Sequence, residues 1–105
     1  MTVDHTPIKA DVLPLPQYRA LVEVWRERCR QDGKWGAIHS FDSRTPEEWL
    51  TILAEEFGEL AEGILKRDEA NTMEEATQVA AVAIAILESL QRRSMQERDH
   101  DATQR

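Results

Sequence analysis

Acidic side chains are concentrated in one stretch of the chain, and a second acidic group follows it after a short interval. The first stretch holds Glu55, Glu56, Glu59 and Glu62, and Glu75 belongs to the second group. Carboxylate oxygens are the ligands that Mg²⁺ prefers, and Mg²⁺ sites are usually completed by water and by phosphate groups of a substrate. The two acidic groups therefore indicate a metal site, provided that the fold brings them together.

The first acidic stretch is predicted to lie on a helix with a clear start. Thr45-Pro46-Glu47-Glu48 supplies an N-cap threonine, a proline at the first helical position and a glutamate three residues after the cap, which is a capping box. The helix is expected to run to about Arg67. Its apolar stripe consists of Leu50, Leu53, Phe57, Leu60, Ala61 and Ile64.

A second helix is predicted from about Met73 to Arg93, with Asn71 or Thr72 as its cap. The segment 68–71 leaves room for only a short turn between the two helices. They are therefore expected to form an antiparallel hairpin.

The hairpin is expected to bring the acidic side chains to one seam. At about 100° per residue, Glu56 lies at the edge of the apolar stripe and Glu59 lies about 60° further round. Glu75 falls within the apolar arc of the second helix. With a rise of about 1.5 Å per residue, Glu59 lies about 10 Å from the turn and Gln78 about 9 Å from it on the other helix. Like charges at one seam repel unless a cation or a proton intervenes, so the seam favours a divalent cation.

Two interpretations other than a metal site can also account for these glutamates. A run of glutamates on a helix is commonly a solvated face. Glu75 can also complete a capping box that starts at Thr72, whereas capping by Asn71 with Glu74 leaves Glu75 free.

The residues around the hairpin divide the chain into three parts. Residues 1–16 carry three prolines and are predicted to form an extended N-terminal arm. Residues 17–93 are predicted to form one all-α domain, which begins with a helix from about Gln17 to Gln31 that Gly33 stops. Residues 94–105 are predicted to form a polar C-terminal tail that frays.

Size and charge limit the classes of function. A chain of 105 residues has room for one domain, and so short a chain buries only about two-thirds of its unfolded surface, which favours a core shared between copies. A net charge of −7 argues against nucleic acid as a partner. The longest uncharged run, residues 76–87, is shorter than the roughly 20 residues of a membrane-spanning helix. The single cysteine, Cys29, forms no internal disulfide, and a cytoplasmic location is expected.

The hairpin residues resemble those of the MazG-like all-alpha nucleoside triphosphate pyrophosphohydrolases. The stretch Trp49–Glu62 looks like the family's first metal motif, Glu-x-x-Glu within a Glu-Glu-x-Gly-Glu-Leu context. The family's second motif, Glu-x-x-Asp, aligns with Glu75-Ala76-Thr77-Gln78, where Gln78 replaces the aspartate. The loop segment Lys34–His39 resembles the stretch by which members of the family contact the base, with Ile38 replacing an aromatic residue.

The resemblance implies a four-helix bundle built across a homo-oligomer, a dimer or a tetramer. It implies a Mg²⁺ ion, with Mn²⁺ as an alternative, held by Glu56, Glu59, Glu75 and Gln78. Glu55 or Glu62 is then the candidate catalytic base. Contacts with the substrate are expected from Lys34, Trp35 and His39.

The activity that the resemblance implies is cleavage of a nucleoside or deoxynucleoside triphosphate to the monophosphate and pyrophosphate, as in the house-cleaning of nucleotide pools. A glutamine at position 78 can ligate a cation through its carbonyl oxygen, but it carries no charge and cannot act as a base. The alternative is therefore a catalytically weakened helical oligomer that binds nucleotide or a protein partner without turnover.

Overall fold

All of the regular structure in the described part of the chain is helical. The computed structural model describes residues 14–35 and 44–104. They form α1 (Leu15–Trp35), α3 (Pro46–Leu65) and α4 (Glu69–Gln104). The predicted all-α class is confirmed for these residues, and none of the three helices has the length and apolar character needed to span a bilayer.

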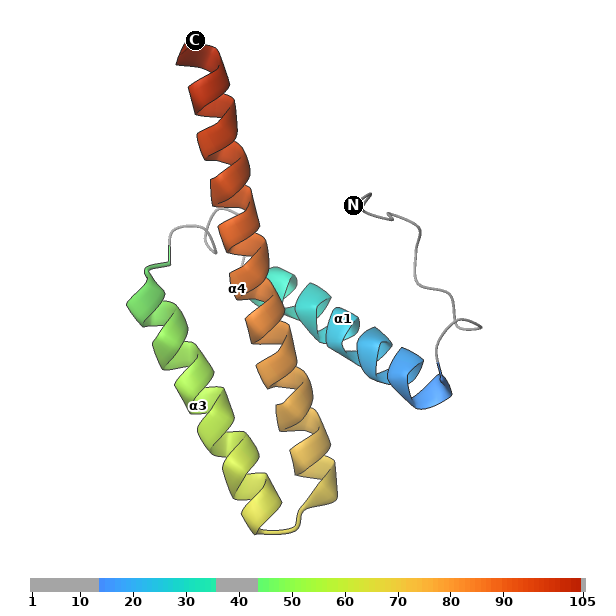
Figure 1. The fold of residues 1–105 in the computed structure, drawn as a ribbon. Coiled ribbons are helices and arrows are strands. Elements are labelled where there is room, and N and C mark those ends of the chain that lie inside the picture. The colour runs from blue at the N-terminus through green and yellow to red at the C-terminus, as the bar shows by residue number, and fades with distance from the viewer. Residues whose placement is uncertain (1–13, 36–43, 105) are drawn as a thin grey trace.

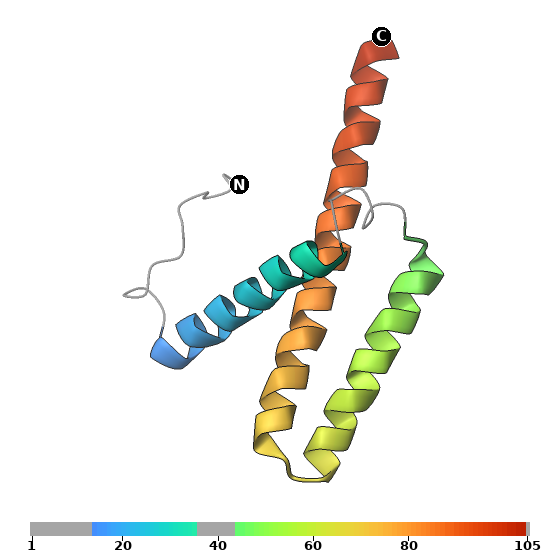
Figure 2. The ribbon, with the colours of Figure 1, turned by 180° about the vertical axis from the view of Figure 1, so that it is seen from behind.

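The helices are arranged as a hairpin with one crossing helix. α3 and α4 run antiparallel and pack along each other, and α1 crosses α4 at a steep angle (Figure 1). Seen from behind, α1 again meets α4 and stands away from α3 (Figure 2). The predicted hairpin is therefore present, and α4 is the helix that both others contact.

The start of α3 follows the predicted capping pattern. Thr45 has extended backbone angles, and its hydroxyl oxygen accepts a hydrogen bond from the backbone N–H of Glu48 at 3.2 Å. The same hydroxyl donates to the Glu48 carboxylate at 3.3 Å. Pro46 occupies the first turn, where a missing N–H leaves no helical bond unmade.

The core of the hairpin is small and lies near its open end. Trp49 of α3 packs against Val82 and Ala85 of α4, and these three residues are at most 6% exposed. The Arg44 guanidinium lies over the Trp49 ring at 5.5 Å from its centroid. Arg93 reaches back from α4 and donates to the Arg44 carbonyl oxygen at 3.0 Å. These contacts hold the entry of α3 against α4.

A Schellman motif ends α3. The backbone N–H of Asp68 donates to the Gly63 carbonyl oxygen at 3.0 Å, and that of Arg67 donates to the Ile64 carbonyl oxygen at 3.1 Å. Arg67 has a φ of 56°, the left-handed conformation that this motif requires and that glycine adopts more easily. The chain therefore reverses within residues 66–68.

The start of α4 differs from the sequence prediction. Asp68 is the cap, because its side chain accepts a hydrogen bond from the backbone N–H of Asn71 at 3.1 Å. The predicted caps, Asn71 and Thr72, lie inside the helix, and the Thr72 hydroxyl donates to the Asp68 carbonyl oxygen at 2.7 Å. The prediction of a start near Met73 was wrong because Asp68 is an equally good cap and lies directly after the turn.

The turn is held close by a glycine. A Cβ atom at Gly63 would lie 3.0 Å from Thr72 Oγ1 and 3.4 Å from the Thr72 backbone nitrogen, so a larger residue would require Thr72 to shift by a few tenths of an ångström. The other glycine of α3, Gly58, has open space around it. Close approach of a neighbouring helix therefore accounts for one of the two helical glycines.

Two helix boundaries extend beyond the predicted ones. Gly33 does not stop α1, which continues to Trp35, because a helical glycine costs only about 1 kcal/mol and the flanking residues favour helix. α4 continues past Arg93 to Gln104, since its polar residues include good helix formers and Arg98 bonds back to Ser94 at 3.4 Å. Most of the predicted N-terminal arm, residues 1–13, lies outside the described residues.

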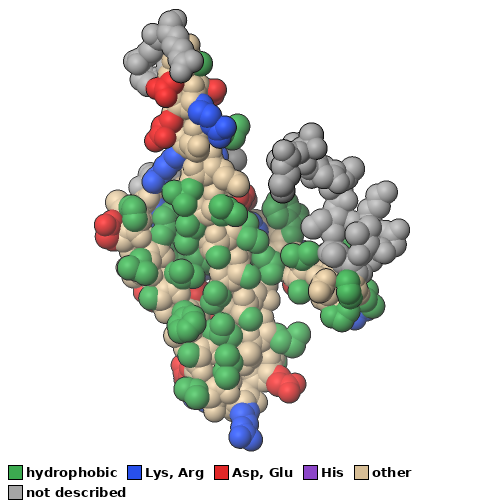
Figure 3. Space-filling model, in the orientation of Figure 1, with side chains coloured by type: hydrophobic (Ala, Val, Ile, Leu, Met, Phe, Trp, Pro, Cys, Tyr) green, Lys and Arg blue, Asp and Glu red, His purple; other side chains and the backbone are tan. Residues whose placement is uncertain are grey.

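One face of the hairpin is apolar and exposed. Leu50, Phe57 and Ile64 of α3 are 66%, 63% and 56% exposed, although the sequence pattern places them on the apolar stripe. Leu87 and Leu90 of α4 are also exposed. Apolar side chains cover both helices in the space-filling view of this side (Figure 3). The stripe is thus only partly buried within one chain.

Candidate metal centre

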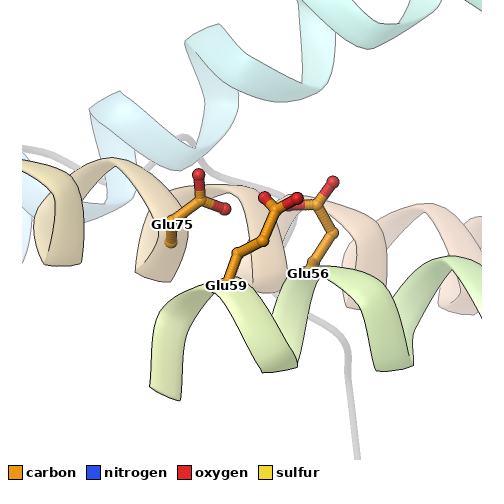
Figure 4. A group of neighbouring side chains, drawn as sticks. All are labelled: Glu56, Glu59 and Glu75. Carbon is orange, nitrogen blue, oxygen red and sulfur yellow. The ribbon is translucent and has the colours of Figure 1, made fainter. Parts of the chain in front are cut away.

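Three of the predicted metal ligands converge in the seam between α3 and α4. Glu56, Glu59 and Glu75 each offer one carboxylate oxygen, and these oxygens all lie within 4.8 Å of one another. The three carboxyl groups point to the side on which α1 passes (Figure 4). The helical spacing explains the convergence, because Glu56 and Glu59 lie one turn apart and Glu75 faces them across the hairpin.

Two of the three carboxyl groups are buried or half-buried, and each has one oxygen without a hydrogen-bond donor among the described residues. Glu75 is only 8% exposed and Glu56 is half-buried. One carboxylate oxygen of each, Oε2, is enclosed and has no hydrogen-bond partner among the described residues. A buried carboxylate oxygen without a donor is costly, so the site favours a cation or a proton at this position.

The electrostatics of the cluster favour proton or cation uptake. The pKa of Glu59 is raised, first by its hydrogen bond with Glu75 and then by the Glu75 charge. Burial, followed by the interaction with Glu56, raises the pKa of Glu75. These shifts mean that ionisation of both Glu59 and Glu75 is unfavourable without a counter-charge.

A cavity of about 320 Å³ opens beside the cluster, between α1 and the hairpin. Glu56 and the half-buried Gln78 lie on the hairpin side of this cavity. Glu74 lies on the hairpin side as well, and on the α1 side the cavity is lined by Glu27, Arg30, Gln31 and Lys34. The cavity is therefore lined by three acidic, two basic and two amide side chains, and Arg30 is ion-paired with Glu27 on the α1 side.

Comparisons with protein-family models, with curated proteins and with solved structures give no significant match to this chain.

The two candidate bases lie on the exposed side of α3. Both Glu55 and Glu62 are exposed, and the charge of each contributes to the raised pKa of Glu59, so both act on the cluster at short range. Glu62 forms an ion pair with Lys66, and its hydrogen bond with that residue lowers the pKa of Glu62. No ion pair within the described ranges involves Glu55, which leaves it the stronger candidate.

Of the three residues predicted to contact the substrate, two lie among the described residues. Lys34 lies in the last turn of α1, is exposed and lines the cavity. Trp35 is the last residue of α1. His39 lies outside the described residues.

Sequence reasoning did not assign four residues of the cavity wall to the site: Glu27, Arg30, Gln31 and Glu74. Arg30 has a recognisable signal, because it is one helical turn before Lys34 and therefore shares its face. Gln31 has none, since a single amide in a polar helix does not stand out. Its position in the wall depends on how α1 docks, which the sequence pattern alone does not reveal.

Proposed function

We propose that this chain is a Mg²⁺-dependent nucleotide pyrophosphohydrolase of the cytoplasm that cleaves a nucleoside or deoxynucleoside triphosphate to the monophosphate and pyrophosphate. The observation that carries the proposal is the convergence of Glu56, Glu59 and Glu75 within 4.8 Å, with orphaned oxygens on two of them. The resemblance of these residues to the metal motifs of the MazG-like pyrophosphohydrolases supports it. House-cleaning of nucleotide pools is the corresponding biological role.

The three glutamates are the residues that would hold the cation, and Mn²⁺ would suit the same oxygen ligands. The Gln78 carbonyl oxygen can add a neutral ligand from the adjoining cavity wall. A bound divalent cation neutralises charge on the phosphates and lowers the pKa of a bound water. The protein's part is to fix the phosphates and to take up the proton of the attacking water.

Glu55 is the proposed base. A general base must be ionised and available for a new hydrogen bond, and Glu62 is already engaged by Lys66. Glu55 is exposed and close enough to Glu59 for its charge to raise the pKa of that residue. In this assignment the Glu55 carboxylate accepts the proton of the water that attacks the α-phosphorus, and pyrophosphate leaves.

The exposed hairpin face supports an oligomer. Leu50, Phe57 and Ile64 recur every seven residues on α3, and Leu87 and Leu90 of α4 are exposed as well. Apolar side chains gather over both helices in Figure 3. Such a spacing forms a continuous seam for another helix. Two hairpins that pack through this face would make a four-helix bundle, and the proposed assembly is a dimer or a tetramer.

The rival function is a helical oligomer that binds nucleotide or a protein partner without turnover. The neutral Gln78 favours it, because the cavity then has one fewer negative charge for the cation.

The deciding experiment measures pyrophosphate release from a broad panel of canonical and modified triphosphates, with Mg²⁺ and with Mn²⁺. We expect release by the wild type, loss with Glu59→Gln, and an increase with Gln78→Asp. Glu97→Gln, an exposed change on the distal part of α4, is the matched control and should leave release unchanged. Absence of release from every triphosphate with both cations would refute the enzyme and leave the binding module.

A further inference from the structure

The apolar side of α1 faces away from the helix on which α1 docks. α1 packs on α4 through Glu27, Arg28 and Gln31, which are at most 8% exposed. Its apolar residues recur at intervals of three and four and form a row, called here the α1 stripe: Leu15, Tyr18, Val22, Trp25 and Cys29. At about 100° per residue, the centre of this row lies roughly 150° round the helix from the docked residues.

The α1 stripe is open over most of its length. Leu15 and Trp25 are 54% and 61% exposed, Cys29 is exposed, and Tyr18 and Val22 are half-buried. Within the described ranges α1 contacts α4 but not α3, and Figure 2 shows it standing away from α3. A regular spacing of three and four residues lets a helix pack along another helix. The stripe is therefore a surface on which a further helix can lie.

The charged side chains nearest the open side of the stripe are basic. They lie roughly 60–100° from its centre and are Arg19, Arg26 and Arg30. Arg26 is ion-paired with Glu23 and Arg30 with Glu27, and both glutamates lie further round the helix. No ion pair within the described ranges involves Arg19. Exposed pairs of this kind contribute at most about 1 kcal/mol, so the arginines remain available to a partner.

The opposite side of the stripe offers no comparable charge. Asp32 is the acidic residue there, and it is already engaged by the buried Arg28. The accessible flank is consequently basic, and opposite charges across an interface favour the matching partner. Acidic side chains beside an apolar row are the chemistry that complements the α1 stripe.

A second copy of α1 does not have this chemistry. Two copies that pack antiparallel would set Arg19 of one beside Arg26 of the other, and like charges oppose that contact. The available area is also small. With about half of their area exposed, the side chains of the stripe and the adjacent Leu21 offer roughly 500 Å², whereas a stable interface takes about 800 Å² from each partner. A single helix suits this surface better than a folded copy.

An anionic lipid surface is also a poor match, because the chain carries a net charge of −7 and would be repelled as a whole. A helix that lies along the stripe meets only the local basic flank. We propose that the α1 stripe binds an acidic amphipathic helix of a protein partner, with the acidic residues of that helix beside Arg19 and Arg26. The inference goes beyond the proposed function and does not rest on the metal centre.

The test uses the full chain and two synthetic helical peptides of the length of α1. Both carry leucine at intervals of three and four residues, and the flanking residues are glutamate in one peptide and lysine in the other. Titration calorimetry should show that the glutamate peptide binds at least about tenfold more tightly than the lysine peptide. Arg19→Glu combined with Arg26→Glu should reverse that order.

Two further measurements locate the peptide on the α1 stripe. Trp25→Ser should weaken binding of the glutamate peptide by at least about tenfold, since tryptophan is commonly a main anchor of an interface. Met95→Ser is the matched control, because Met95 is 60% exposed and lies on the distal part of α4. The peptide should also slow the alkylation of Cys29, which is the single cysteine of the sequence.

Binding that depends on Trp25, with unchanged sedimentation of the Trp25→Ser chain alone, would support the acidic helix. Absence of binding, equal affinity for both peptides, or unchanged alkylation of Cys29 would overturn the proposal. A lower sedimentation coefficient of Trp25→Ser without peptide would also overturn it and assign the stripe to a second copy. Trp25-dependent binding to vesicles of phosphatidylcholine and phosphatidylserine would assign the stripe to a lipid surface instead. None of these measurements involves triphosphate hydrolysis, so the proposed function stands or falls separately.

Discussion

Arg28 Nε donates to Glu88 Oε2 at 2.5 Å and joins α1 to the middle of α4. The Arg28 side chain is 3% exposed, and its Nη1 also contacts Asp32 one turn later at 2.5 Å. A buried guanidinium with two carboxylate partners fixes the position at which α1 crosses the hairpin. The wall formed by Arg30, Gln31 and Lys34 therefore depends on this contact.

Replacement of Arg28 should weaken the docking of α1. Arg28→Met keeps much of the apolar stem but removes both ion pairs, and we expect the free energy of unfolding in urea to fall by about 1–3 kcal/mol. Arg26→Met removes an exposed pair with Glu23 and should change it by less than about 0.5 kcal/mol. Equal effects of the two substitutions would show that the Arg28 contact does not fix α1.

Glu75→Gln should stabilise the metal-free protein and abolish its response to metal. The change removes a buried negative charge beside Glu56 and Glu59, and gains of this kind at functional sites are about 0.5–2 kcal/mol. Thermal melts with a chelator and with Mg²⁺ measure both effects. Glu97→Gln should match the wild type in both conditions. A Glu75 variant that still gains stability from Mg²⁺ would contradict the assignment.

The carboxylate cluster should make stability depend on pH. The pKa values of Glu59 and Glu75 are raised in the folded protein, so the folded state holds protons that the unfolded state has released. Their contribution to stability is complete below about pH 4.3 and is lost as the pH rises through the raised values. The charges that raise the pKa of Glu59 come from Glu75, Glu55 and Glu62, and those that raise the pKa of Glu75 come from Glu56 and Glu74.

Mg²⁺ should cancel the loss of stability at higher pH. The cation competes with protons for the same carboxylate oxygens and binds more tightly as the pH rises. Melting temperatures of the wild type and of Glu59→Gln, taken from pH 4 to pH 8 with and without Mg²⁺, isolate the effect. The difference between the two proteins should grow with pH in chelator. A constant difference would show that Glu59 titrates normally.

The turn after α3 offers a stabilising substitution. Arg67 has a φ of 56°, which costs an L-residue about 1–2 kcal/mol, and glycine avoids this cost at the expense of a more flexible unfolded chain. Arg67→Gly should therefore raise the free energy of unfolding by about 0.5–1 kcal/mol. Lys66→Gly, at a φ of −82°, should lower it instead. If both variants lost stability, the Arg67 side chain would stabilise the folded protein by more than its left-handed backbone conformation destabilises it.

The apolar hairpin face should control assembly. Phe57→Glu places a charge in the middle of the proposed interface and should weaken association by at least about 100-fold. Sedimentation velocity would then show a monomer where the wild type is a dimer or tetramer. Leu65 is 83% exposed but lies outside the seven-residue series, so Leu65→Ser should leave the assembly intact. A wild type that sediments as a monomer would contradict the proposed bundle.

The hairpin and the carboxylate convergence follow from local rules. Thr45 fixes the start of α3, and the helical period then fixes the faces on which Glu56 and Glu59 lie. A short turn is enough to bring Glu75 level with them. These features are predictable because each depends on residues that are near one another in the sequence.

The start of α4 and the docking of α1 cannot be predicted from residues that are neighbours in the sequence. Asp68, Asn71 and Thr72 are all good caps, and the left-handed Arg67 selects the first of them. The contribution of Gln31 to the cavity is set by the crossing of α1 over α4, which joins residues far apart in the chain. The hydrophobic pattern of α1 does not predict this docking, because Leu21 and Trp25 are exposed and the polar residues Glu27, Arg28 and Gln31 are the buried ones.

The turn at residues 66–68 determines the site through its length. A helix rotates by about 100° for each residue, so one inserted or deleted residue here would turn Glu75 away from Glu56 and Glu59. Substitutions in the turn leave that phase unchanged. Related chains that keep Gly63 and the Asp68 cap can therefore diverge at the other positions between the two acidic motifs and keep the site, whereas a single-codon insertion or deletion would remove it.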